Sequence, residues 1–271
     1  MTAFFASPMM RSLRERLVRL YGEPEADIAL ERLAVHVGRY GTGGRAEGRG
    51  IKWSQQDAIL ITHADMIRAP HEDPLVTLKR FLDTHLTGVF NTVHLLPFFP
   101  SSSDDGFAVI HYRQVRPDLG RWEDIQAISR SFHLMIDLVL NHVSAQSGWF
   151  DDFKTGTAPG RDYFIEVDPA AELSAVIRPR TSPLLTPIMT RTGRRHVWTT
   201  FSADQVDLNF ARPDVLFEML DLLLFYISQG ARIIRMDAVA FLWKQVGTPC
   251  LHLPQTHEIV RLFRDFLKLT S

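Results

Sequence analysis

The sequence predicts an α/β protein in which parallel strands alternate with helices. From residue 58 onward, short apolar runs and amphipathic segments follow one another, and this order is typical of parallel strands joined by crossover helices. The runs are apolar throughout rather than alternating, as expected for strands covered on both faces. The chain has 271 residues, of which 45% are hydrophobic and 23% charged. It is therefore long enough for a large core and unlike a disordered chain.

Two helices and a linker precede this alternating region. Leucines at helical spacing predict helices over residues 10–20 and 25–37. Residues 38–50 are too rich in glycine for a regular element and predict a linker. This linker lacks the Gly-Lys-Ser/Thr ending of a phosphate-binding loop, which argues against nucleotide binding there.

The elements of the alternating region follow in order. Four apolar runs predict strands, at residues 58–62, 89–96, 133–140 and 231–236. Amphipathic or long apolar segments predict helices at residues 74–86, 122–132, 214–228 and 257–269. Pro74 suits the first turn of the first of these helices, and Gly230 suits the end of the third. Residues 143–210 interrupt the rhythm and predict an irregular insertion after the third strand.

Charge and cysteine content narrow the class of protein. The net charge is −1, so no nucleic-acid partner is expected, and no Lys/Arg run suggests a polybasic membrane anchor. The single cysteine, Cys250, cannot form an internal disulfide, which fits a reducing compartment. The first twenty residues do not have the order of a secretory signal, and no apolar run reaches 18 residues. We therefore expect a cytoplasmic protein.

The clearest chemical signal lies at the end of the fourth strand. Arg235 and Asp237 are two residues apart, so they share a face of an extended strand. A guanidinium lowers the pKa of a neighbouring carboxyl, and an oriented carboxylate can attack an acetal carbon. The same pair could instead be a structural ion pair at a strand end.

Two further polar clusters follow earlier strands. Asp137, Asn141 and His142 lie at and after the third strand, and Asp104 and Asp105 follow the second. Taken alone, the first cluster could be a hydrogen-bond network that joins neighbouring strands, and the second could be a polar turn. All three clusters occur at consecutive strand ends, where parallel α/β folds collect functional groups, and this favours a site.

These motifs together resemble those of the α-amylase superfamily of glycoside hydrolases and transglycosylases. DLVLNH (137–142), QVDLN (205–209), GARIIRMDA (230–238) and DDGF (104–107) match its ordered elements from about residue 55 to the end. Other segments, such as LLPFFPSSSDDGF and HVWTTFSADQVDLN, resemble the sucrose-phosphorylase branch, and most of all its glucosylglycerate-phosphorylase type. The resemblance implies the N-terminal half of a (β/α)8 TIM barrel with an irregular B-domain-like insertion after strand 3.

The resemblance also implies roles for individual residues in a retaining reaction on an α-glucoside. Asp237 would attack the anomeric carbon and Arg235 would orient it, while His142 and Asp105 would bind glucose hydroxyls and Phe107 would pack on the sugar ring. Phosphate would then release α-glucose 1-phosphate. Asp137 and Asn141 belong to the first conserved region. The branch generally lacks the calcium of the amylases, so we expect no metal and no cofactor.

The resemblance divides the chain into four parts. These are helices and linker (1–50), barrel strands 1–3 (51–142), the insertion (143–210) and the barrel continuation (211–271). The family takes its acid/base glutamate from strand five, and Glu258 precedes that strand. We therefore expect a truncated chain that is inactive alone and poorly soluble. Its ligands would be an α-glucoside and phosphate, and its protein partner a second copy or a complementing C-terminal fragment.

Other functions stay open at this point. A related sucrose hydrolase or glucosyltransferase would carry the same motifs, and the acceptor could be glycerate, glycerol, fructose or a fructose phosphate. A non-catalytic sugar-binding or assembly module is the alternative of another class, although the intact RMDA motif favours an enzyme. His252 and His257 lack the order of a zinc-binding helix, and no dinucleotide-binding glycine motif follows a strand.

Overall fold

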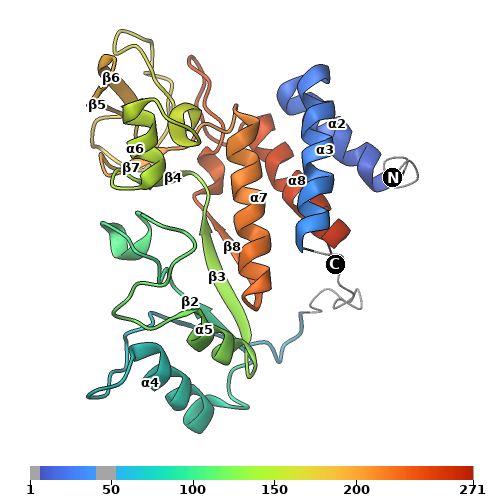
Figure 1. Ribbon diagram of the computed structural model, residues 1–271, viewed down its shortest axis with the longest axis vertical. Helices are drawn as coiled ribbons and strands as arrows, with labels where there is room; N and C mark the ends of the chain where they lie inside the picture. Colours follow the sequence, from blue (N-terminus) through green and yellow to red (C-terminus); the bar gives the residue numbers. More distant parts are fainter. Residues whose placement is uncertain (1–6, 41–52, 271) are drawn as a thin grey trace.

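A four-stranded parallel sheet forms the centre of the protein (Figure 1). The computed structural model describes residues 7–40 and 53–270. The sheet has the order β1-β2-β3-β8, and every neighbouring pair is parallel. Its strands are β1 (Ile59–Thr62), β2 (Thr92–Leu95), β3 (His133–Val139) and β8 (Ala231–Asp237). The predicted α/β class with parallel strands is confirmed.

The two faces of the central strands differ in chemistry. On β3, Leu134, Ile136 and Leu138 are fully buried and share one face, because side chains alternate along a strand. The opposite face carries Asp137, and the parallel register places it beside Arg235 on β8. One face therefore packs into the core, while the other carries the polar groups.

The edge strand β1 departs from the expectation that every strand is covered on both faces. Its Ile59 is 39% exposed and its Ile61 61% exposed, whereas all four residues of β2 are buried. The reason is topological. Within the described part of the chain, β1 pairs with a strand on one side only, so its side chains gain fewer neighbours than those of a central strand.

The helices of the alternating region form where the sequence predicts them. They are α4 (Pro74–Phe81), continued by a π-helical turn η1 (Leu82–Leu86), α5 (Trp122–Ser129), α7 (Pro213–Ser228) and α8 (Pro254–Thr270). The helix α5 packs on β3 and on α4, and α7 packs on β8. Proline begins α4, α7 and α8, a position that costs no intrahelical hydrogen bond. The last helix begins three residues before its predicted start.

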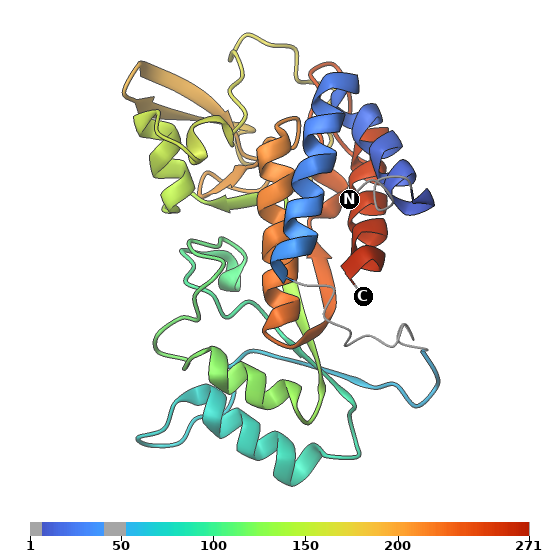
Figure 2. The same ribbon diagram turned by 45° about the vertical axis from the view of Figure 1, so that its right-hand side comes forward.

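The two N-terminal helices pack on the outer side of α7 and α8 (Figures 1 and 2). They are α2 (Pro8–Tyr21) and α3 (Glu23–Tyr40). Arg16 of α2 pairs with Glu258 and Asp265 of α8, at N···O distances of 2.9 and 2.8 Å. The predicted linker begins at residue 38, but α3 continues to Tyr40, and residues 41–52 lie outside the described part of the chain.

The insertion is more regular than predicted. It contains β4 (His142–Ser144), α6 (Gly148–Thr155), β5 (Leu185–Thr190), β6 (Gly193–Trp198) and β7 (Gln205–Asp207). β4 pairs antiparallel with β7, and β5 with β6. The insertion predicted after the third strand is present, and these elements make it regular in part. The β5–β6 hairpin has a proline in one strand and three consecutive basic residues in the other, so it lacks the apolar runs by which the other strands are predicted.

None of the helices within residues 7–40 and 53–270 is both long and apolar enough to cross a bilayer.

Candidate active site

The polar residues predicted at the strand ends meet where β3 and β8 lie side by side. The register places Asp137 opposite Arg235 and Val139 opposite Asp237. Parallel strands end at the same edge of their sheet, so the sequence clusters converge there. After Asp237 the chain turns at Ala238, whose φ of 53° is left-handed, into the short helix η4 (Val239–Phe241).

One guanidinium connects two carboxylates across these strands. Arg235 Nη1 lies 2.5 Å from Asp137 Oδ1 and 3.0 Å from Asp237 Oδ1. Asp137 is fully buried, and the side chain of Asp237 is 17% exposed. The shared guanidinium therefore orients Asp237 relative to the sheet and leaves it within reach of a ligand.

The surroundings of Asp237 raise the pKa of its carboxyl, whereas the sequence predicted that Arg235 would lower it. Burial raises the pKa of this carboxyl above its ordinary value, and the charge of Asp137 adds to the rise, although Arg235 opposes it. The expectation that Arg235 would lower the pKa considered only the neighbouring residue in sequence. Desolvation outweighs that one favourable charge.

His142 occupies a fully enclosed position beside this pair. Its Nδ1 lies 3.3 Å from the side-chain Nδ2 of Asn141, and its Nε2 lies 3.2 Å from the backbone carbonyl oxygen of Phe107. Burial lowers the pKa of His142 to about 4. A neutral ring that accepts from Asn141 at Nδ1 carries its hydrogen on Nε2 and donates it to Phe107.

The structure separates the two adjacent aspartates, Asp104 and Asp105. The Asp104 carboxylate accepts a hydrogen bond of 2.8 Å from Gln205 Nε2, which lies 3.1 Å from His142 Nε2. The charge of Asp104 also acts on Asp237. Both aspartates have left-handed backbone angles, with φ of 56° and 49°, so the chain turns sharply between their side chains.

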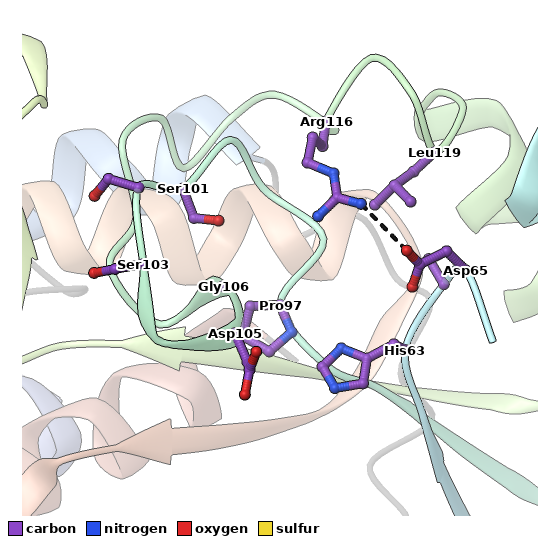
Figure 3. A pocket seen from close by; sticks show the side chains of 11 residues that line it. His63, Asp65, Pro97, Ser101, Ser103, Asp105, Gly106, Arg116 and Leu119 are labelled. Carbon is purple, nitrogen blue, oxygen red and sulfur yellow. Dashed lines mark hydrogen bonds and ion pairs between the residues drawn. The ribbon is translucent and has the colours of Figure 1, made fainter.

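Asp105, the residue predicted to bind glucose, lines a neighbouring cavity of about 360 Å³ (Figure 3). Figure 3 shows its carboxylate next to the His63 ring, with Arg116 reaching Asp65 across the cavity. Sequence alone did not separate Asp104 from Asp105, because adjacent residues in a turn are resolved only by the backbone angles of that turn.

Phe107 faces the charged pair rather than the apolar core alone. The Cζ atom of Arg235 lies 5.7 Å from the centre of the Phe107 ring, a cation–π distance. The ring is partly buried and packs on the core. It therefore presents an apolar face beside Arg235, and its packing on a sugar ring stays a prediction.

A buried lysine that the sequence analysis did not propose links two segments of the site. Lys244 Nζ lies 2.6 Å from Asn141 Oδ1 and 2.7 Å from Asp207 Oδ2. The lysine side chain is 3% exposed and Asp207 is fully buried. This ammonium joins the end of β3 to the last strand of the insertion. In the sequence its only signal is a basic residue directly after the apolar run 241–243.

On the side of the insertion, the site is bordered by the Phe201 ring and by the guanidinium groups of Arg178 and Arg180. The Phe201 ring lies 5.0 Å from the His142 ring and 5.4 Å from Phe241, measured between ring centres. The guanidinium of Arg180 lies 6.0 Å from the Phe201 ring centre, and Arg178 donates to the Thr200 carbonyl over 3.4 Å. Cationic groups thus stand beside the carboxylate site.

Metal ligands are not grouped in the described residues. Their histidine, cysteine, aspartate and glutamate side chains form no set of three or more that could hold an ion.

Comparisons with known proteins agree with this geometry. A family model described as the catalytic domain of alpha amylase matches residues 87–269. A glucosylglycerate phosphorylase of Allomeiothermus silvanus is 50% identical over 256 residues, which are 94% of this chain and 45% of that protein. A glucosylglycerate phosphorylase of Escherichia coli K12 is 49% identical over 216 residues, covering 79% of this chain and 39% of its own length.

A solved structure is similar as well. The crystal structure of sucrose 6F-phosphate phosphorylase from Thermoanaerobacter thermosaccharolyticum aligns with a TM-score of 0.72 and 28% identity. The alignment covers 81% of this chain and 47% of that one. The chain thus spans less than half the length of each of these relatives.

Proposed function

This chain belongs to the alpha-amylase family, and from that premise we propose that it takes part in retaining glucosyl transfer from an α-glucoside to phosphate. The observation that carries the proposal is the guanidinium of Arg235. It pairs both with the buried Asp137 and with Asp237, and it holds the Asp237 carboxylate partly exposed. We also propose that residues 51–142 and 211–271 form one catalytic unit, with residues 143–210 as an insertion beside its site.

The proposed reaction has two displacements at the anomeric carbon. An Asp237 carboxylate oxygen attacks this carbon, and the bond to the glycosidic oxygen breaks while that oxygen takes up a proton from a general acid. A phosphate oxygen then attacks the same carbon, and the ester bond to Asp237 breaks. Two inversions give α-glucose 1-phosphate and return Asp237 as a carboxylate.

We propose that three side chains hold the glucosyl ring. His142 is neutral, because burial lowers its pKa to about 4, and its Nε2 hydrogen, which the Phe107 carbonyl accepts, would be shared with a glucose hydroxyl when the sugar binds. Asp104 is held by Gln205 beside it and accepts a hydroxyl hydrogen. Phe107 packs on the ring face. Asp105, which lines the adjacent cavity, remains the prediction from sequence for the same role.

We assign the phosphate to the insertion side of the site. Arg180 stands over Phe201, and Phe201 packs on His142, so this cation lies beside the rings that an incoming phosphate would approach. The names of the two relatives at about half identity favour glucosylglycerate as the donor. Glycerate is also an anion, so the same cation suits both exchanging groups.

A trapping experiment tests the nucleophile directly. The full chain is incubated with 5-fluoro-α-glucosyl fluoride, whose fluoride leaves without protonation, so the test does not depend on a general acid. We expect one 5-fluoroglucosyl group on the peptide that contains Asp237, detected by mass spectrometry. The variant Asp237→Asn should remain unlabelled. No label, or a label on another residue, overturns the proposal.

A second assay separates the reaction classes. A phosphorylase converts glucosylglycerate and phosphate to glucose 1-phosphate, whereas a hydrolase gives glucose at a rate independent of phosphate. A sugar-binding module would bind glucose and show neither label nor product. The expectation that this chain alone shows no turnover stays a prediction, and the same assay tests it.

A further inference from the structure

A buried histidine on β2 is linked to the proposed nucleophile through Asp137 and Arg235. His94 is 3% exposed and lies between the fully buried Val93 and Leu95. A polar ring in such a place costs stability unless it is hydrogen-bonded. We propose that His94 is a positioning residue for the nucleophile, holding Asp137 in the orientation that lets Arg235 reach Asp237.

The geometry connects three neighbouring strands. His94 Nε2 lies 2.8 Å from Asp137 Oδ2, and Arg235 Nη1 lies 2.5 Å from the other oxygen, Asp137 Oδ1. The same Nη1 lies 3.0 Å from Asp237 Oδ1. An ionised carboxylate only accepts, so His94 donates from Nε2. Histidine, carboxylate and guanidinium thus form one line of hydrogen bonds that ends at the nucleophile.

Asp137 acts on Asp237 in two ways. It competes for the single nitrogen of Arg235, and its negative charge raises the pKa of Asp237. A donor on the second oxygen of Asp137 spreads this charge and satisfies a fully buried acceptor. Without His94, Arg235 would be drawn to Asp137, and the charge that Asp237 feels would become more negative.

The other groups that face these carboxylates do not replace the histidine. Tyr226 lies near enough to Asp137 to feel its charge, but its hydroxyl donates to the Tyr112 carbonyl. Near Asp237, besides Arg235 and Asp137, stand Asp104 and Tyr112. Tyr112 donates its hydroxyl to the carbonyls of residues 139 and 142. Only His94 and Arg235 donate side-chain hydrogen bonds to Asp137 within the described residues.

The inference rests on the proposed function, since it treats Asp237 as the nucleophile, but its test needs no turnover. The full chain is labelled with 13C at the aspartate side-chain carboxyls, and the carboxyl of Asp237 is assigned by its loss in Asp237→Asn. We expect His94→Leu to raise the titration midpoint of Asp237 by about one pH unit, a tenfold change in its acid dissociation constant. His94→Gln keeps an N–H donor and should restore the midpoint to within about 0.3 unit.

A matched variant controls for general loosening of the strand. Thr92→Val removes a buried hydroxyl from the same face of β2, where Thr92 donates to Asn91 rather than to Asp137. It should leave the Asp237 midpoint unchanged. Equal shifts in His94→Leu and Thr92→Val, or no shift in His94→Leu, overturn the inference.

A measurement on the unmodified chain covers the case in which His94→Leu does not fold. The 15N shifts of the His94 ring should show the hydrogen on Nε2, and a ring protonated on Nδ1 alone overturns the inference. Failure of the inference differs visibly from failure of the proposed function. In the first case Asp237 is labelled by the fluoroglucoside but its midpoint ignores His94, and in the second the midpoint responds while no label appears.

Discussion

Lys244→Met should destabilise the protein strongly, because it removes a buried charge. The lysine ammonium is the charged partner of Asp207, at 2.7 Å, and both side chains are buried. Removing one member of a buried ion pair leaves the other charge uncompensated, which costs about 3–5 kcal/mol.

The remaining partners of Asp207 reduce that cost. Its carboxylate still accepts hydrogen bonds from the backbone N–H and the hydroxyl of Thr200, at 2.8 and 2.5 Å, and from Asn141, at 2.9 Å. We therefore expect a loss near the lower limit, about 3 kcal/mol. With a urea m-value of about 3 kcal/mol/M, the midpoint of unfolding should fall by about 1 M.

Urea unfolding followed by circular dichroism measures this change. Lys268→Met is the matched control, because Lys268 pairs with Asp265 over 3.2 Å while its side chain is 50% exposed. Its removal should cost less than about 1 kcal/mol. The double variant Lys244→Met, Asp207→Asn should recover part of the loss, since no bare charge is then left inside. A Lys244→Met loss no larger than that of Lys268→Met would refute the reasoning.

Three other predictions follow from the site. Because the pKa of His142 is about 4 in the folded state and about 6.5 when unfolded, the unfolded chain binds more protons between these values. Stability should therefore fall by about 3 kcal/mol as pH drops from 7 to 4, and His142→Gln should flatten this slope in urea unfolding at several pH values. Asp104→Asn should slow labelling by 5-fluoro-α-glucosyl fluoride by about 100-fold, the loss of one charge-assisted hydrogen bond, while Asp105→Asn changes it less than about threefold. Equal effects of the two would remove the distinction between them. Arg180→Ala should slow the release of the 5-fluoroglucosyl group by phosphate by about tenfold or more and leave the labelling rate unchanged. A parallel loss of labelling would place Arg180 with the glucose site instead.

The strands and helices of the central unit could be predicted because their signals are local. Runs of valine, leucine and isoleucine predicted all four strands of the sheet, and proline or helical spacing predicted the helices around it. The hairpin of β5 and β6 could not be predicted in this way. Its pairing depends on cross-strand contacts between segments that carry Pro187 and a basic run, and such contacts are absent from single-segment patterns.

Within the candidate site too, residues with a local sequence signal could be predicted, and residues whose partners are remote in the chain could not. The rule that functional groups follow parallel strands was enough to propose Asp137, His142, Arg235 and Asp237. Lys244 was not proposed, because its partner Asn141 is 103 positions away in the chain. His94 was missed for the same reason, since a histidine within an apolar strand has no local signal for the carboxylate that it meets.

By itself, the sequence determined the order of the four sheet strands and the helices around them, the family motifs and the acidic and basic residues at the strand ends. These follow from the identity and spacing of neighbouring residues, which the chain carries in any conformation. Only the tertiary structure decided that Asp104 rather than Asp105 faces His142, that Lys244 joins β3 to the insertion, and that the pKa of Asp237 rises. Each of these depends on burial and on distances between remote segments, because desolvation and Coulomb interactions are set by the surrounding atoms and not by position along the chain.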